Sequence, residues 1–206
     1  MVSANQNAGF SIVKFNGASG ANTVGHGLSQ APELFIMKSA NVSGNWGVYV
    51  KDLGADKYLT LNSSAAQTTS TTAWNNTHPT STLLHWQGGI VAAGGSGQYN
   101  NIAYCWHSVT GYSKIGTYSG SNSSLSITTG FKPSFLLIKR TDTSGSWVII
   151  DNIRGDGAGA KALFPDLTNV ETHSWNTTFN NTGFTIDSNE AWLSTSGGTY
   201  IYMAFK

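Results

Sequence analysis

Charged residues and cysteine are scarce in this chain. Only 10% of its 206 residues are charged and the net charge is +1, whereas an ordinary soluble domain carries about 25% charged residues. Lys and Arg are scattered along the chain and form no cluster larger than Lys139–Arg140. The sequence therefore gives no sign of the basic face with which proteins attract nucleic acid, and we predict no nucleic-acid partner. The single cysteine, Cys105, excludes an internal disulfide framework.

Long apolar runs are also missing. The longest, at 34–37 and 135–138, are far shorter than the roughly 20 residues that a membrane-spanning helix needs, so we predict no membrane insertion. Residues 1–9 have neither the basic start nor the apolar centre of a secretory signal. Hydrophobic residues nevertheless make up 39% of the chain and aromatic residues 12%, which is too apolar for a disordered chain.

The second half of the chain repeats the first. The matching segments are GFSIVKFNGAS (9–19) with GYSKIGTYSGS (111–121), APELFIMK (31–38) with KPSFLLIK (132–139), SGNWGVYV (43–50) with SGSWVIID (144–151), and NIAYCWH (101–107) with YIYMAFK (200–206). The matches keep their order at a nearly constant offset. We therefore predict a tandem duplication, with an N-terminal arm over 1–8 and repeats over 9–107 and 111–206.

The apolar residues of each copy recur with the period of a β-strand. In TYIYMAF (199–205), Ile201 and Met203 share one face, and Tyr200 and Tyr202 share the other. Clusters of Gly, Asn, Ser and Thr separate such runs, which predicts about six strands per copy and almost no helix. We predict an all-β chain of two pseudo-symmetric, jelly-roll-like β-sandwich repeats. ELFIM and SFLLI are apolar on both faces, which predicts central strands where the two copies pack together.

No catalytic or metal-binding constellation stands out. The five histidines lack the HxH or HExxH spacing of metal ligands, and no serine lies in a GxSxG motif. His107 could activate Cys105 from the same strand face, but the aromatic neighbours of Cys105 favour a buried, inert thiol. Asp151 and Asp156 could ligate calcium, although a solvated loop is favoured. We predict no enzyme, no metal and no cofactor.

Two tryptophan–asparagine pairs are the candidate ligand-binding residues. Trp74 and Asn75 lie in TTAWNNTH, and Trp175 and Asn176 lie in THSWNTTF, both very polar stretches. An exposed Trp beside Asn can stack on a sugar ring and hydrogen-bond its hydroxyl groups, which would make a host-surface glycan the ligand. The alternative, which we favour, is that both tryptophans fold back into the ends of their sandwiches.

The order of these motifs carries a resemblance to a known family. GFSIVKFNG, TVGHGL, SGNW, KYLTLN, GYSKIGTYSG, TGFKPSFLLIKR and SGGTYIYMAF follow one another over residues 9–206. This series resembles a duplicated β-domain of tail-fibre and other virion proteins of tailed bacteriophages, especially marine and cyanobacterial ones.

The resemblance implies a structural role and a location in the virion, the extracellular phage particle. It implies a non-enzymatic virion structural protein, either a tail-fibre receptor-binding head or a capsid-decoration module. Its partners would be other virion proteins and further copies of itself, with a trimer favoured. A carbohydrate-binding, lectin-like domain of a bacterial surface or secreted protein is the alternative, and a depolymerase of host polysaccharide is the least favoured one.

Overall fold

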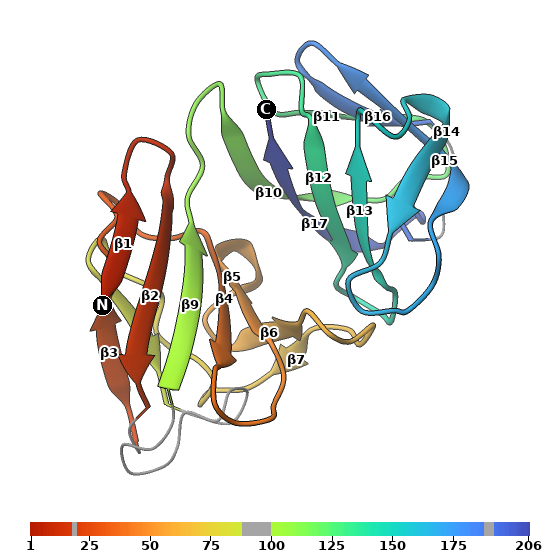
Figure 1. Cartoon of the computed structure of the whole chain (residues 1–206). Helices are drawn as coiled ribbons and strands as arrows, with labels where there is room; N and C mark the ends of the chain where they lie inside the picture. Colours follow the sequence, from red (N-terminus) through yellow and green to blue (C-terminus); the bar gives the residue numbers. More distant parts are fainter. Residues whose placement is uncertain (18–19, 88–99, 188–191) are drawn as a thin grey trace. The chain divides into compact units, whose positions relative to one another are not determined.

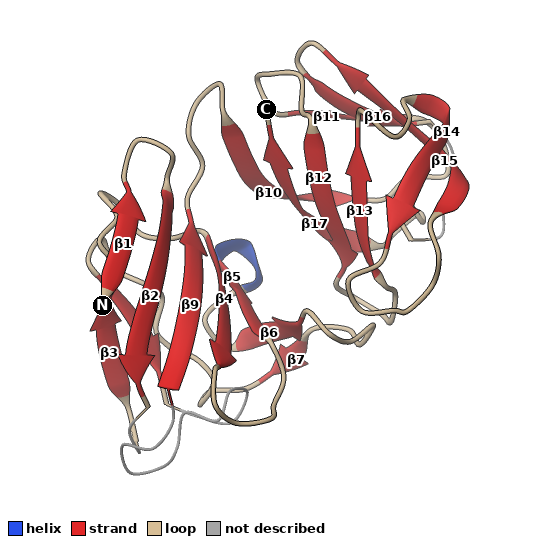
Figure 2. Cartoon of the chain, viewed as in Figure 1, coloured by secondary structure: helices blue, strands red, loops and turns tan. Residues whose placement is uncertain are grey.

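The chain folds into two compact units built almost entirely of β-strands (Figures 1 and 2). The computed structural model describes residues 1–17, 20–87, 100–187 and 192–206. Unit 1 comprises Met1–Leu61 and Gln67–Ser108, and unit 2 comprises Asn62–Ala66 and Val109–Lys206. Within the described residues, the regular structure other than strand is a single 3-10 turn at Lys51–Leu53. The predicted all-β class is therefore confirmed.

Unit 1 arranges its described strands in two sheets. The strands are β1 (Val2–Asn5), β2 (Phe10–Asn16), β3 (Asn22–Gly25), β4 (Leu34–Ser39), β5 (Gly47–Val50), β6 (Lys57–Thr60), β7 (Thr68–Thr69), β8 (Leu83–Trp86) and β9 (Asn100–Trp106). A seven-stranded sheet has the order β1-β2-β9-β4-β5-β6-β7, and β3 pairs with β8 separately. The stretch 1–8, expected as an arm, supplies the edge strand β1 of the large sheet.

Unit 2 joins its described strands in one sheet. The strands are β10 (Ser113–Ser119), β11 (Leu125–Thr128), β12 (Phe135–Arg140), β13 (Trp147–Asp151), β14 (Gly157–Leu163), β15 (Thr172–Asn180), β16 (Gly183–Ile186) and β17 (Thr199–Phe205). Their order is β10-β17-β12-β13-β14-β15-β16-β11. Six strands per copy was too low a number, because short polar strands such as β3 (NTVG) carry no clear apolar alternation.

The two units share one strand order. In unit 1, β2, β9, β4, β5 and β6 lie side by side, and in unit 2 so do β10, β17, β12, β13 and β14. The β3–β8 pair of unit 1 corresponds in the same way to the β11–β16 pair of unit 2. ELFIM and SFLLI lie in β4 and β12, each paired on both sides, so their predicted central position is confirmed.

The strand pairing does not follow the sequence match between the first residues of the two copies. The pairs concerned are β2 with β9 in unit 1 and β10 with β17 in unit 2. GFSIVKFNG has nine residues and GYSKIGTYSG has ten. Phe15 pairs with Asn101 in unit 1 and Tyr118 pairs with Tyr200 in unit 2, so the strands align through the closing aromatic-x-Gly and not through the opening. A slip of one residue moves side chains to the opposite face of a sheet. Ser113 consequently does not occupy the place that the opening match assigns to it.

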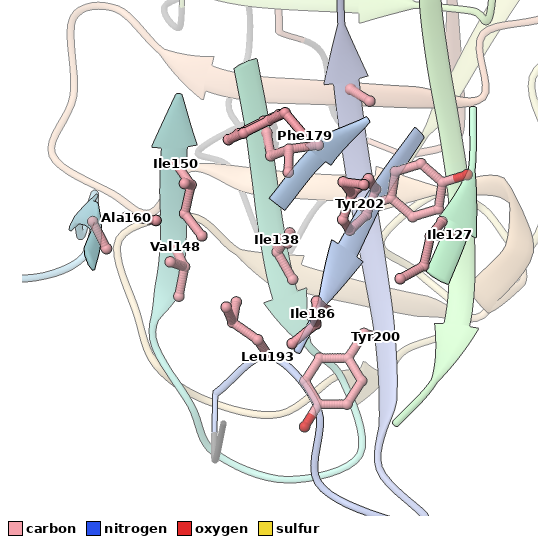
Figure 3. Packing of buried hydrophobic residues seen from close by; sticks show 14 of the residues in the cluster. Ile127, Ile138, Val148, Ile150, Ala160, Phe179, Ile186, Leu193, Tyr200 and Tyr202 are labelled. Atoms are coloured by element: carbon pink, nitrogen blue, oxygen red, sulfur yellow. The ribbon is translucent and has the colours of Figure 1, made fainter. Parts of the chain in front are cut away.

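Each unit has its own apolar core. In unit 2, Tyr200 and Tyr202 of β17 point into a cluster with Ile138, Val148 and residues of the distant β11–β16 pair (Figure 3). In unit 1, the small β3–β8 sheet contributes side chains to the cluster beneath the large sheet. A second layer over a main sheet is the arrangement of a β-sandwich, and both units are consistent with it.

Candidate functional site

Trp74 is part of the core of unit 1. Its side chain is 1% exposed, and its Nε1–H donates a hydrogen bond of 2.8 Å to the carbonyl of Lys57. Its ring lies edge-on to that of Phe35, with 4.8 Å between the centroids, and to that of Tyr49. The expectation that Trp74 is exposed for stacking on a sugar is wrong, because the polar stretch around it is a turn that returns the indole to the core. The favoured alternative is correct for this residue.

The other three candidate residues are divided between the two units. Asn75 follows it with a φ of 54°, and its carbonyl accepts a hydrogen bond from Thr77 Oγ1. Trp175 and Asn176 belong to the other unit, in β15, where they pair with Ala160 and Ala158. The side chain of Trp175 lies outside the described residues, so both alternatives for it, exposed for sugar binding or folded back into its sandwich, stay predictions.

Cys105 is buried, as predicted. Its side chain is 0% exposed, and burial raises the pKa of its thiol to about 12. His107, the proposed activating base, is also buried and turns elsewhere, since its Nδ1 lies 3.0 Å from Gln30 Nε2 and 2.9 Å from the carbonyl of Ser108. A thiol that stays protonated is a poor nucleophile.

The carboxylates considered for calcium are engaged by protein groups. Asp151 accepts hydrogen bonds from the Nε and the main-chain N–H of Arg154, and Asp156 accepts one from the main-chain N–H of Phe179. Across the described part of the chain, no group of three or more His, Cys, Asp or Glu residues is placed to hold a metal ion. Among those residues, too, no helix has the length and apolar character that crossing a membrane requires.

An open groove on unit 1 gathers aromatic, amide and cationic side chains. It has a volume of about 640 Å³ and is lined by Lys38, Ser39, Ala40, Asn41, Val42, Ser43, Trp46, Ile102 and Tyr104. The β4–β5 loop forms one wall, and β9 supplies Ile102 and Tyr104. Trp46 and Tyr104 are both half-buried, which leaves part of each ring exposed. Aromatic surface beside hydrogen-bonding groups suits an extended or ring-shaped ligand.

Hydrogen bonds hold the polar side chains of the groove in place. Lys38 Nζ donates to the carbonyls of Ser39 and Val42, at 2.7 and 3.1 Å. Asn41 Oδ1 accepts from the main-chain N–H of Asn100, at 2.8 Å. We do not predict this groove from the sequence. The repeated SGxW loop was the signal that could have identified it.

The equivalent place on unit 2 holds a piece of polypeptide. The carbonyl of Ser64 accepts hydrogen bonds from the main-chain N–H of Gly145, at 2.8 Å, and from Lys139 Nζ, at 3.3 Å. Lys139 and Gly145 match Lys38 and Gly44 in the repeat. Lys139 is 0% exposed, and burial lowers its pKa to about 8 against the opposing attraction of nearby Asp166 and Asp142.

A smaller pocket on unit 1 contains a tyrosine–histidine pair. It has a volume of about 220 Å³ and is lined by Ala31, Pro32, Tyr49, Lys51, Asp52, His78 and Pro79. Tyr49 Oη lies 2.6 Å from His78 Nδ1. Burial, reinforced by the charge of Asp52, raises the pKa of Tyr49 well above its ordinary value. The phenol therefore stays protonated, and it shares a hydrogen bond with the imidazole.

The comparisons with known proteins identify the family of the chain. The chain belongs to the DUF7483 family, a domain of unknown function, and the family model matches residues 1–206. No curated protein and no solved structure matches the chain.

Proposed function

We propose that this member of the DUF7483 family is a non-enzymatic structural protein of a tailed-phage particle, acting as a tail-fibre receptor-binding head or as a capsid-decoration module. The resemblance of its ordered motifs to virion β-domains supports this role. The observation that carries the proposal is the groove on unit 1. It offers an open surface for contact, as a recognition or assembly module needs, and its polar groups hold one another in place.

We propose further that the two units arose by duplication of one β-domain. Equivalent hydrogen bonds support this origin. The main-chain N–H of Asn100 donates to Asn41 Oδ1 in unit 1, and the main-chain N–H of Thr199 donates to Asp142 Oδ1 in unit 2. The second apolar face of each central strand, such as Ile36 in β4 and Leu137 in β12, supports the further proposal that the copies pack as a pair.

Finding the chain in assembled particles tests the proposed role. Mass spectrometry of particles purified from the natural source is expected to detect the chain in stoichiometric amount with other virion proteins. Immunogold labelling with an antibody raised against the recombinant chain then separates a tail-fibre from a capsid position. Particles that lack the chain would overturn the proposal.

A lectin-like domain of a bacterial surface or secreted protein is the second candidate. The exposed parts of the Trp46 and Tyr104 rings, beside Asn41 and Lys38, favour it over a purely structural role. A glycan array probed with the native chain and with Trp46→Ala tests it. Binding that disappears in the variant would support this candidate, and an array without any binder would exclude it.

A further inference from the structure

The two equivalent loops of the units differ in what they hold. The loop between β12 and β13 receives the segment 62–66, whose Ser64 carbonyl is held by Lys139 and Gly145. The loop between β4 and β5 borders the open groove instead. Trp147, the first residue of β13 after the first loop, is 1% exposed, whereas Trp46, the last residue of the second loop, is half-buried. The loop of unit 1 therefore borders a groove at the place where the loop of unit 2 holds a segment of chain.

Unit 2 carries a segment that matches 62–66 in the repeat. Leu59 pairs with Val48 and Leu163 pairs with Ile149, which are equivalent places in the two sheets. The segment 62–66 begins three residues after Leu59, and 166–170 begins three residues after Leu163. Both segments connect the same two strands of their copies, β6 with β7 and β14 with β15.

The segment 166–170 presents apolar side chains to solvent. Val170 is 82% exposed and Leu167 is 39% exposed. Covering exposed aliphatic side chains with a binding partner lowers the free energy, because apolar surface is removed from water. Asp166 is held within unit 2, where its Oδ1 accepts from the main-chain N–H of Trp147, so the residues left to engage a partner are 167–170.

We propose that the groove of unit 1 binds residues 167–170 of a second copy of this chain. This inference deepens the proposed function by naming the partner in assembly, and it rests on that function only for its biological setting. Thr168 corresponds to Ser64, so its carbonyl would accept from Lys38 Nζ and from the main-chain N–H of Gly44. A Cβ added at Gly44 would meet no atom within 4 Å, so there is open space beside the Cα of this residue.

The side chains of the two surfaces are complementary. Leu167 and Val170 would pack on the exposed parts of the Trp46 and Tyr104 rings, while the main chain of the segment takes the hydrogen bonds. The groove and the segment belong to different units, so the contact is heterologous. Such contacts generate closed rings when the rotation between copies closes, and filaments when it does not. A closed ring of three would be the trimer that the resemblance implies.

Sedimentation velocity over a range of protein concentrations tests the proposal. A contact of a few residues is small, so association is expected mainly at high concentration. We expect the native chain to associate and two variants to stay monomeric: Leu167→Asp/Val170→Asp in the segment, and Trp46→Ala in the groove. Ile153→Asp is the matched control, because Ile153 is 88% exposed and lies outside the segment, and it is expected to associate like the native chain.

Mixing the two monomeric variants gives the sharpest result. The groove variant retains a competent segment and the segment variant retains a competent groove, so the mixture is expected to form one-to-one dimers that grow no further. A synthetic peptide with the sequence FPDLTNVE is expected to bind the segment variant and not the groove variant, by fluorescence anisotropy. Urea unfolding of each variant verifies that it is folded.

Several outcomes would overturn the proposal. A native chain that stays monomeric up to its solubility limit would do so, as would unchanged association of the folded segment variant. Monomeric variants that fail to complement on mixing would indicate a different interface. Loss of glycan binding in Trp46→Ala, with association unchanged, would assign the groove to a carbohydrate instead. Each of these results is independent of whether the chain is found in phage particles.

Discussion

Lys139 donates a hydrogen bond of 3.3 Å to the carbonyl of Ser64, although 75 residues separate the two in sequence. The ammonium group also donates to the carbonyl of Arg140, at 2.6 Å. Its counterpart Lys38 likewise donates to the carbonyl of the next residue, Ser39. The second hydrogen bond of Lys38 goes to the carbonyl of Val42, in the adjoining β4–β5 loop. One lysine thus anchors a distant segment, and the other borders an open groove.

The burial of Lys139 predicts a stability that depends on pH. Its pKa in the folded chain is about 8, lowered mainly by burial from an ordinary value of 10.5. Below about pH 8 the lysine is protonated in both states, and the cost of burying its charge is present in full. Between about 8 and 10.5 the unfolded chain binds more protons than the folded chain, so the free energy of unfolding contributed by this group rises with pH.

A comparison with Lys139→Met isolates this effect. Urea unfolding at several pH values between 7 and 10 is expected to show a rise in the native chain that is missing from the variant. Ionisation of tyrosines is common to both proteins and cancels in the difference. Parallel pH profiles for the two proteins would contradict the assignment to Lys139.

The core position of Trp74 predicts a large loss of stability in Trp74→Ala. Removing the indole leaves a cavity and the Lys57 carbonyl without its donor, and such truncations cost about 3–5 kcal/mol. Trp46→Ala, at a half-buried position of the same unit, is expected to cost less. Urea unfolding measures both, and a change of under about 1 kcal/mol in Trp74→Ala would show that the indole does not pack as described.

The sequence predicts those parts of the fold that rest on local patterns. The apolar runs ELFIM and SFLLI lie in the central strands β4 and β12, each of which is paired on both sides, and an apolar run is typical of a central strand. Alternation placed Tyr200 and Tyr202 on one face of β17, and that face packs into the core. These features are determined within a few residues of sequence.

The candidate site was harder to predict because it depends on long-range packing. The polar neighbours of Trp74 indicate a loop but do not show in which direction the indole turns. Lys38 and Lys139 occupy matching positions, yet only Lys139 meets a segment from elsewhere in the chain. The difference arises because the β6–β7 connection passes beside Lys139. The residues around the two lysines do not indicate the path of that distant connection.

Cys105 is expected to resist modification until the chain unfolds. The thiol is 0% exposed and has a pKa of about 12, so at neutral pH it presents neither access nor thiolate to a reagent. Reaction with Ellman's reagent should proceed to completion in guanidinium chloride and be slow under native conditions, limited by opening of the fold. Rapid reaction of the native chain would revive the activated-thiol hypothesis that the structure contradicts.

Asp142 is expected to make the chain sensitive to acid. Its pKa is lowered to about 2, first by the hydrogen bonds from Arg140 and then by the main-chain N–H of Thr199. The stability from this depressed pKa is present in full above its ordinary value of 3.8 and is lost as pH falls from there through about 2. Asp142→Asn is the matched variant, since Asn41 makes the equivalent bond without a charge. Urea unfolding between pH 5 and 2 should show a smaller loss of stability in the variant, and an identical loss would exclude Asp142 as the source.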